Sequence, residues 1–137
     1  MNIVIIDGQG GKLGKTLVES AIVRFPQARI TAVGTNTLAT AAMIKAGAKR
    51  AATGENAVVV ACRDADFIIG PIGIVIADAL YGEITPAMAC AVAQSRASRV
   101  LLPMSKCENI VAGVREGMTI QELVDDAMNR VAGLESC

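Results

Sequence analysis

The 137-residue sequence contains no histidine and no tryptophan, and it has only one tyrosine and two phenylalanines. The absence of histidine removes the commonest general base and a major zinc ligand. The scarcity of aromatic residues argues against a surface on which nucleic-acid bases stack. Thirteen basic residues balance thirteen acidic ones, so there is no excess positive charge to attract a phosphate backbone. We therefore expect a small-molecule partner and no nucleic acid.

Four cysteines stand at positions 62, 90, 107 and 137, and no two of them form a C-x-x-C pair. This spacing argues against a zinc site and a disulfide framework, so we expect reduced thiols and no metal. The N-terminal MNIVIID has no basic region before its apolar run, and the most apolar stretch, 67–80, is shorter than the roughly 20 residues of a membrane helix. We expect a cytoplasmic protein with no membrane partner.

Apolar β-branched runs alternate with helix-periodic segments along the chain. Strands are expected over 3–6, 30–33, 50–52, 67–69 and 99–102, with 110–114 as a candidate sixth, edge strand. Helices are expected over 13–25, 37–46 and 57–63, and from the start signals at 85–86 and 119–122. This alternation predicts an α/β fold: a three-layer, doubly wound, Rossmann-like domain with a mainly parallel sheet of five or six strands. A single nucleotide-binding domain over 1–137, with strand order 3-2-1-4-5, is expected.

The stretch DGQGGKLGKT, residues 7–16, combines two phosphate-binding patterns. Its last three residues match the Gly-Lys-Thr end of a P-loop. The P-loop spacing, however, requires a glycine where Gln9 stands, and the acid that would help to hold magnesium after a buried strand is replaced by Gly70-Pro71. A divergent P-loop-like phosphohydrolase is therefore only the third of our functional hypotheses.

The dinucleotide pattern fits the same stretch better, in the form Gly-x-x-Gly-x-x-Gly. Gly8 permits a sharp turn after the strand, Gly10 and Gly11 let the backbone approach a pyrophosphate, and Gly14 lets the helix pack against the sheet. The N–H groups of the helix's first turn would attract the anion. The predicted cofactor-binding residues of this loop are Asp7, Gly8, Gly10, Gly11, Lys12 and Gly14. We expect Gly11→Val to abolish binding and leave the fold largely intact; the alternative is that the glycines only form a tight turn.

Two further segments complete the predicted cofactor site. The acid that would bind an adenosine ribose is absent after the second strand, where Thr35 and Asn36 offer hydrogen bonds to a ribose or a 2′-phosphate instead. Gly70, Pro71 and Gly73 follow the fourth strand and are expected to hold bare backbone against the ligand from the opposite side. The alternative for this second segment is a rigid turn without ligand contacts.

Four residues are candidates for catalysis. Lys106 and Cys107 follow the fifth strand, where the lysine would bind a carboxylate or phosphate and lower the pKa of the thiol. Asp78 and Glu83 lie on either side of Tyr81 and offer the acid–base chemistry that histidine does not supply here. The alternative for each is ordinary: an inert thiol, or a solvated surface charge.

Two resemblances support a nucleotide-binding fold. The glycine loop is similar to that of dihydrodipicolinate reductases and other atypical reductases, whose Gly-x-x-Gly-x-x-Gly loop holds NAD(P)H; this likeness covers the first strand, loop and helix. A second resemblance spans most of the chain, through NIVIIDGQGG, AVGTN, ATGENAV, CRDADFIIGPIGIVIADALYGEITPAMA and LLPMSKC. These stretches look like a family of short, uncharacterised bacterial proteins classed as a domain of unknown function. That resemblance implies a Rossmann-like domain and adds no substrate.

The leading hypothesis is binding of a dinucleotide, NAD or NADP, at the 8–14 loop against residues 70–73. If the protein is an enzyme, this predicts a small NAD(P)-dependent oxidoreductase. The second hypothesis is a non-catalytic nucleotide-sensing or regulatory module that acts as an oligomer. The helix over 88–93 is apolar nearly all round, which indicates burial between subunits, so a homo-oligomer, namely a dimer, is expected.

Overall fold

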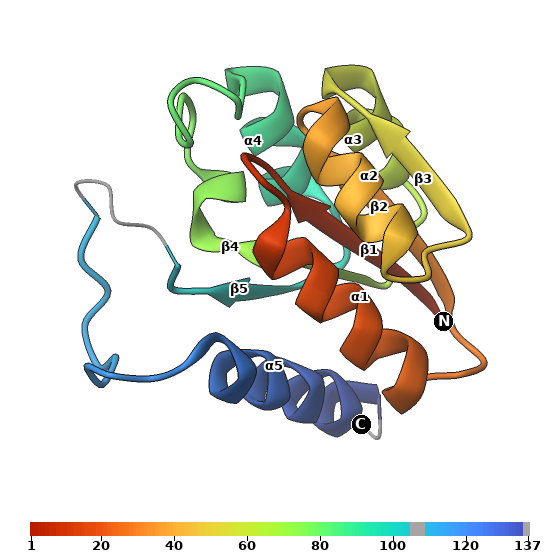
Figure 1. The fold of residues 1–137 in the computed structure, drawn as a ribbon. Helices are drawn as coiled ribbons and strands as arrows, with labels where there is room; N and C mark the ends of the chain where they lie inside the picture. Colours follow the sequence, from red (N-terminus) through yellow and green to blue (C-terminus); the bar gives the residue numbers. More distant parts are fainter. Residues whose placement is uncertain (105–108, 136–137) are drawn as a thin grey trace.

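The computed structural model describes residues 1–104 and 109–135 of the chain (Figure 1). Within these residues, five strands form one sheet in the order β3-β2-β1-β4-β5, and every pair in it is parallel. The strands are β1 (Asn2–Asp7), β2 (Arg29–Gly34), β3 (Arg50–Thr53), β4 (Phe67–Pro71) and β5 (Ser98–Leu102). The predicted α/β class, parallel sheet and strand order are confirmed.

Helices cover both faces of this sheet, which makes three layers (Figure 1). The helices are α1 (Lys12–Arg24), α2 (Thr37–Lys45), α3 (Glu55–Ala61), the short 3₁₀ helix η1 (Ile72–Val75), α4 (Pro86–Gln94) and α5 (Ile120–Glu135). One core lies between the sheet and α1, α2 and α5; the other lies between the sheet and η1, α3 and α4. Because side chains alternate along a strand, Ile3 and Ile5 enter the first core, whereas Val4 and Ile6 enter the second. This two-sided burial explains the unbroken apolar run of β1.

Polar residues define where three of the helices begin. The Asn36 side chain accepts a hydrogen bond from the Ala39 N–H and starts α2, and the Thr85 hydroxyl accepts one from the Met88 N–H and starts α4. At α5, the Glu122 N–H donates to the Thr119 hydroxyl, while the Thr119 N–H donates back to the Glu122 carboxylate. These side chains satisfy N–H groups that have no partner within the helix. The predicted starts at 85–86 and 119–122 are confirmed.

Three sequence expectations differ from the structure. The helix expected over 57–63 is α3, which begins two residues earlier, at Glu55. Residues 110–114 do not form a strand; the chain turns at 112–113 and all of 109–117 is exposed. Helix α4 buries Met88, Ala89 and Val92 against its own domain, so its apolar character does not by itself require a partner subunit. Among the described residues, no helix combines the length and apolar character needed to cross a membrane.

Candidate functional site

A cavity of about 210 Å³ opens where the sheet order reverses, between the carboxyl ends of β1 and β4. In open parallel sheets this is the position at which ligands bind. Six of the predicted site residues line it: Asp7, Gly8, Gly10, Gly11, Lys12 and Pro71. Five other residues line it as well: Gln9, Leu13, Leu80, Met104 and Ile120. The cavity thus has a backbone-rich polar side, formed by the loop, and an apolar side contributed by segments distant in sequence.

Asp7 organises the loop from within. One of its carboxylate oxygens accepts a hydrogen bond from the Gly8 N–H at 2.8 Å, and the other accepts one from the Gly14 N–H at 2.6 Å. Burial of the side chain raises its pKa, the two N–H donors act in the opposite direction, and the negative charge of Glu83 adds to the increase. The Asp7 side chain therefore takes up two N–H groups of the loop and of the first turn of α1 from inside the protein.

Glu83 reaches the same loop from the segment that follows η1. Its Oε1 atom accepts hydrogen bonds from the Gln9 N–H at 2.9 Å, the Thr35 hydroxyl at 2.7 Å and the Asn36 side-chain amide at 2.6 Å. Burial acts to raise the pKa of Glu83, but the three donors outweigh it and the pKa is lowered. One carboxylate oxygen thereby ties the 72–84 segment to the glycine loop and to the end of β2.

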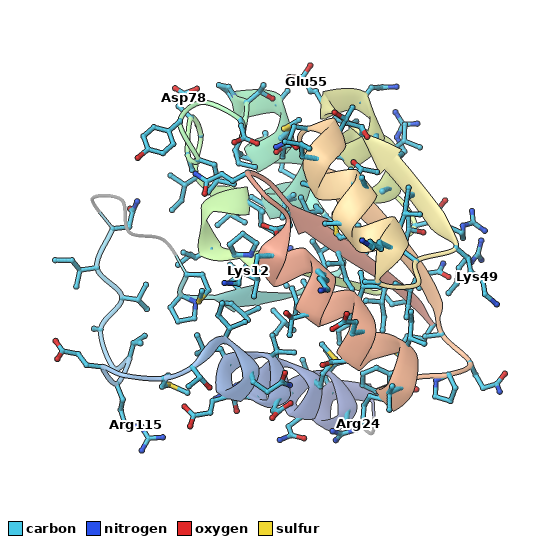
Figure 2. All side chains as sticks on the ribbon, in the orientation of Figure 1. Lys12, Arg24, Lys49, Glu55, Asp78 and Arg115 are labelled. Carbon is cyan, nitrogen blue, oxygen red and sulfur yellow. The ribbon has the colours of Figure 1, made fainter. Side chains whose placement is uncertain are left out.

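The segment tied down by Glu83 has an unusual backbone. Asp78, Leu80 and Tyr81 all have positive φ angles, at 65°, 56° and 56°, a region that non-glycine residues rarely occupy. The Asp78 N–H donates to the Ile84 carbonyl at 2.7 Å, and the Ile84 N–H donates to Ala79 at 3.1 Å, so backbone bonds close the segment on itself. Figure 2 shows the Asp78 side chain at the outer end of this loop. The result is a fixed turn that presents Leu80 to the cavity.

Several glycines serve packing rather than an open approach to a ligand. Gly11 has a φ of 72°, and a Cβ on it would lie 2.7 Å from the Ala39 Cα in α2. A Cβ on Gly14 would lie 2.7 Å from the Met43 sulfur, so this glycine lets α1 pass close to α2 and β1. At Gly10, in contrast, a Cβ would meet nothing within 4 Å. Among the glycines of the 8–14 loop, only Gly10 is therefore open to a ligand and free of packing constraints.

The remaining predicted cofactor-binding residues do not line the cavity. Gly70 and Gly73 are buried; a Cβ on Gly70 would collide with the Ile6 carbonyl oxygen, and one on Gly73 would lie 3.3 Å from Ala79. Thr35 and Asn36 direct their side chains to Glu83. In the described structure these four residues therefore have structural roles. Gly70 and Gly73 allow close packing, and Thr35 and Asn36 hold the Glu83 side chain.

Three backbone N–H groups at the start of α1 are available. Nothing in the described part of the chain accepts a hydrogen bond from the N–H groups of Gly10, Lys12 or Leu13. All three residues line the cavity, and the exposed side chain of Lys12 begins at the same point (Figure 2). Free N–H groups, a helix dipole and a lysine together favour one phosphate group.

Of the four predicted catalytic residues, the structure describes Asp78 and Glu83. Lys106 and Cys107 lie outside the described residues. Asp78 is exposed at the outer loop, and Glu83 is engaged by three donors. The P-loop interpretation also lacks its geometry, because the Thr16 hydroxyl donates to the Lys12 carbonyl at 3.2 Å and does not line the cavity. Over the described ranges, no group of three or more Cys, Asp or Glu side chains is placed to hold a metal ion.

The apolar side of the cavity was missed by sequence reasoning. Leu80, Met104 and Ile120 come from three separate segments, and only the fold brings them together. In the sequence, Gln9 only indicates that the P-loop spacing is not met. In the structure it has a positive φ of 50°, and its N–H donates a hydrogen bond to Glu83. The sequence does contain one signal for the Glu83 contact. No acid follows β2; Thr35 and Asn36 stand there, and their side chains donate hydrogen bonds to Glu83, an acid from a distant segment.

Comparison with known protein families shows which family this chain belongs to. Residues 2–135 match the family described as Domain of unknown function (DUF3842). The chain belongs to this family. The resemblance to an uncharacterised family is thus confirmed, whereas the likeness of the loop to NAD(P)-binding reductases is not. A comparison with curated proteins finds no match.

A solved structure shares the fold. It is described as the crystal structure of a dodecameric FMN-dependent Ubix-like decarboxylase from Escherichia coli O157:H7. The two chains are 17% identical, with a TM-score of 0.53 over 100% of this chain and 96% of the other. At this identity the likeness establishes the Rossmann-like α/β fold, and no more.

The prediction of NAD or NADP as the cofactor is wrong. The finding against it is the solved protein with this fold, which is described as FMN-dependent. The geometry gives a physical reason, because Asp7 and Glu83 already take the N–H groups of Gly8, Gln9 and Gly14. Among the described residues, the loop N–H groups that remain for an anion are those of Gly10, Lys12 and Leu13.

Proposed function

We propose that this protein binds a mononucleotide of the flavin mononucleotide class, with its phosphate at the start of α1. The observation that carries the proposal is the set of free N–H groups of Gly10, Lys12 and Leu13, which face a cavity at the reversal point of the sheet. A phosphate there would accept charge-assisted hydrogen bonds from the backbone and from Lys12. The FMN-dependent description of the solved neighbour supports the choice of nucleotide.

The residues beyond the loop fit a flavin ring by their chemistry. Leu80, Met104, Ile120 and Pro71 give the rest of the cavity an apolar lining, which suits a flat, largely apolar ring. The volume of about 210 Å³ is below the roughly 300–1,000 Å³ of most ligand pockets, so one chain encloses the phosphate end and leaves the ring at the mouth. Bound there, a flavin would supply its own redox or group-transfer chemistry, and the chain would bind and orient it.

A fluorescence titration tests this proposal. FMN fluorescence is measured as protein is added, with riboflavin, which lacks the phosphate, as the matched ligand. We expect FMN to bind at least about tenfold more tightly than riboflavin, because each hydrogen bond to a charged group contributes roughly 1.5–3 kcal/mol. Equal affinity for the two ligands, or no binding of FMN, would show that the loop is not a phosphate site.

A lysine pair locates the phosphate on the protein. Lys12 lines the cavity, whereas Lys15, one turn further along α1, is exposed and does not. Lys12→Gln is expected to weaken FMN binding roughly fivefold, as loss of one partly solvated ion pair of about 1 kcal/mol requires. Lys15→Gln is expected to leave the affinity within about twofold. The reverse ranking would place the phosphate elsewhere on the helix.

A nucleotide sensor or regulatory module that works as an oligomer is the second candidate. The observation that favours it is that both acids are used to hold the loop in place: Asp7 through both of its carboxylate oxygens, and Glu83 through the three donors on its Oε1 atom. The dodecameric description of the solved neighbour supports assembly of this chain into homo-oligomers. A sensor should change its sedimentation coefficient when FMN is added, whereas a ligand that leaves the assembly unchanged would count against regulation of this kind.

A further inference from the structure

Residues 109–118, here called the arm, extend away from the rest of the molecule (Figure 1). Residues 109–117 are all exposed, and Ile110, Val111 and Val114 are exposed by 99%, 38% and 43%. Within the described residues, no hydrogen bond joins the arm to the body. Ordering such a segment costs roughly 1–2 kcal/mol per residue, and its own chain provides almost no contacts to offset this.

The arm borders the edge groove, a cavity of about 740 Å³ beside β5 and α5. Val100, Leu101, Leu123 and Leu134 line the groove from the body, and Val111 and Val114 line it from the arm. Strand β5 is the outermost strand of the sheet: β4 pairs with one edge, and the other edge has no strand partner among the described residues. An open strand edge next to exposed apolar side chains is a template for pairing with another chain.

Each copy of the chain therefore carries both parts of an interface, a strand edge with an apolar groove and an apolar extended arm. Arg115 and Asp126 make the charges complementary as well. The guanidinium of Arg115 has no partner among the described residues; Arg115 lies where the arm bends toward α5 (Figure 2) and lines the groove. Asp126 lines the groove and uses only its Oδ2 atom, for Arg130 at 2.8 Å, so Oδ1 is left for a second arginine.

We infer that a second copy of this chain occupies the edge groove, with arms exchanged between the two copies. Residues 110–114 of one copy add a strand to the free edge of β5 in the other, and Arg115 of the arm pairs with Asp126 across the interface. This exchange is reciprocal, as a two-fold symmetric contact requires. It also explains why a segment with the sequence of an edge strand is not a strand within its own chain.

The exchange reaches the candidate site. Met104 and Ile120 flank the arm on either side, and both line the cavity at the glycine loop. Pro71 lines this cavity and its neighbour Ile72 lines the edge groove, so the two hollows adjoin. A second copy seated in the groove would close the mouth at which one chain leaves a ligand exposed. The inference about assembly does not rest on the proposed ligand.

Sedimentation velocity of the full chain, from micromolar to near-millimolar concentration, tests the inference. The wild type is expected to form species heavier than the 14.1 kDa monomer. The double variant Ile110→Asp, Val114→Asp is expected to weaken association by about a hundredfold or more, because two apolar side chains can no longer be buried. At protein concentrations low enough for the wild type to be monomeric, the thermal unfolding of variant and wild type should match, since both positions are exposed in the monomer.

Leu38→Asp is the matched control, since Leu38 is an apolar residue of α2 with 73% exposure, remote from the groove. This variant is expected to assemble like the wild type. A wild type that remains monomeric at every concentration would overturn the inference. It would also be overturned by a double variant that still associates like the wild type, or by a control that dissociates as much as the double variant.

Discussion

The hydrogen bonds to Glu83 allow a quantitative test of how the glycine loop is held. Glu83→Ala leaves the Gln9 N–H, the Thr35 hydroxyl and the Asn36 amide without their common acceptor. If the site were fully buried, each hydrogen bond to the carboxylate would contribute roughly 1.5–3 kcal/mol to the free energy of unfolding. The site is only half-buried, so in the variant water can hydrogen-bond to the three donors and offset part of this loss. We therefore expect a loss of about 2–3 kcal/mol in the free energy of unfolding, or about 10 °C in Tm.

Thermal unfolding followed by circular dichroism measures this change, and two variants calibrate it. Glu83→Gln keeps an acceptor oxygen but loses the charge, so a smaller loss of about 1 kcal/mol is expected. Glu19→Ala removes an exposed carboxylate of α1 and should change the stability by less than about 0.5 kcal/mol. If Glu83→Ala melts within the range of Glu19→Ala, Glu83 does not anchor the loop.

The pH dependence of the free energy of unfolding is a second test of the role of Glu83. Because the pKa of Glu83 is lowered in the folded state, its stabilisation is present above the unfolded-state pKa, near 4.5, and is lost as the pH falls through the folded-state pKa. The contribution of Asp7 to stability changes with pH in the opposite direction. Because its pKa is raised in the folded state, its ionisation destabilises the fold as the pH rises. The difference between wild type and Glu83→Gln reports Glu83 together with its effect on the pKa of Asp7, and it should shrink as the solution is acidified below about pH 4.5.

Three further predictions follow from the same region and from the cores. Asp7→Asn sets an amide NH₂ against one of the two N–H donors, so the free energy of unfolding should fall by about 2–3 kcal/mol in urea titrations. Gly11→Ala should lower the free energy of unfolding by at least about 1 kcal/mol, because Gly11 has a positive φ and packs against Ala39. Gly10→Ala, where a Cβ meets nothing, should melt like the wild type and weaken FMN binding. The exposed Cys90 should react with a thiol reagent well before Cys62, whose burial raises its pKa to about 11, and mass spectrometry of the labelled peptides would show the order.

The sequence was sufficient for the fold because local signals agreed with one another. The apolar run of β1 fits a strand buried on both faces, and the start signals at Thr85 and at Thr119 to Glu122 fall where α4 and α5 begin. Such agreement between patterning and capping is what specifies one structure. The segment 110–114 is the exception, because its strand propensity has no strand to pair with inside the chain.

The site was predicted less well, for two physical reasons. First, the sequence pattern does not distinguish a glycine needed for packing from one needed for a ligand. Gly11→Val, expected to spare the fold, would instead press a β-branched side chain against Ala39 at a positive φ. Second, the contact between Glu83 and Gln9 spans 74 positions, and only the folded chain brings these two residues together.

The most direct test of the central claim is the change in backbone amide chemical shifts when FMN is added to the ¹⁵N-labelled protein. The account predicts the largest changes at the N–H groups of Gly10, Lys12 and Leu13, and none at Leu38 or Glu55, which lie outside the cavity. Riboflavin should leave the three loop amides nearly unchanged. Shifts confined to other surfaces, or no shifts with saturating FMN, would contradict a phosphate site at the start of α1.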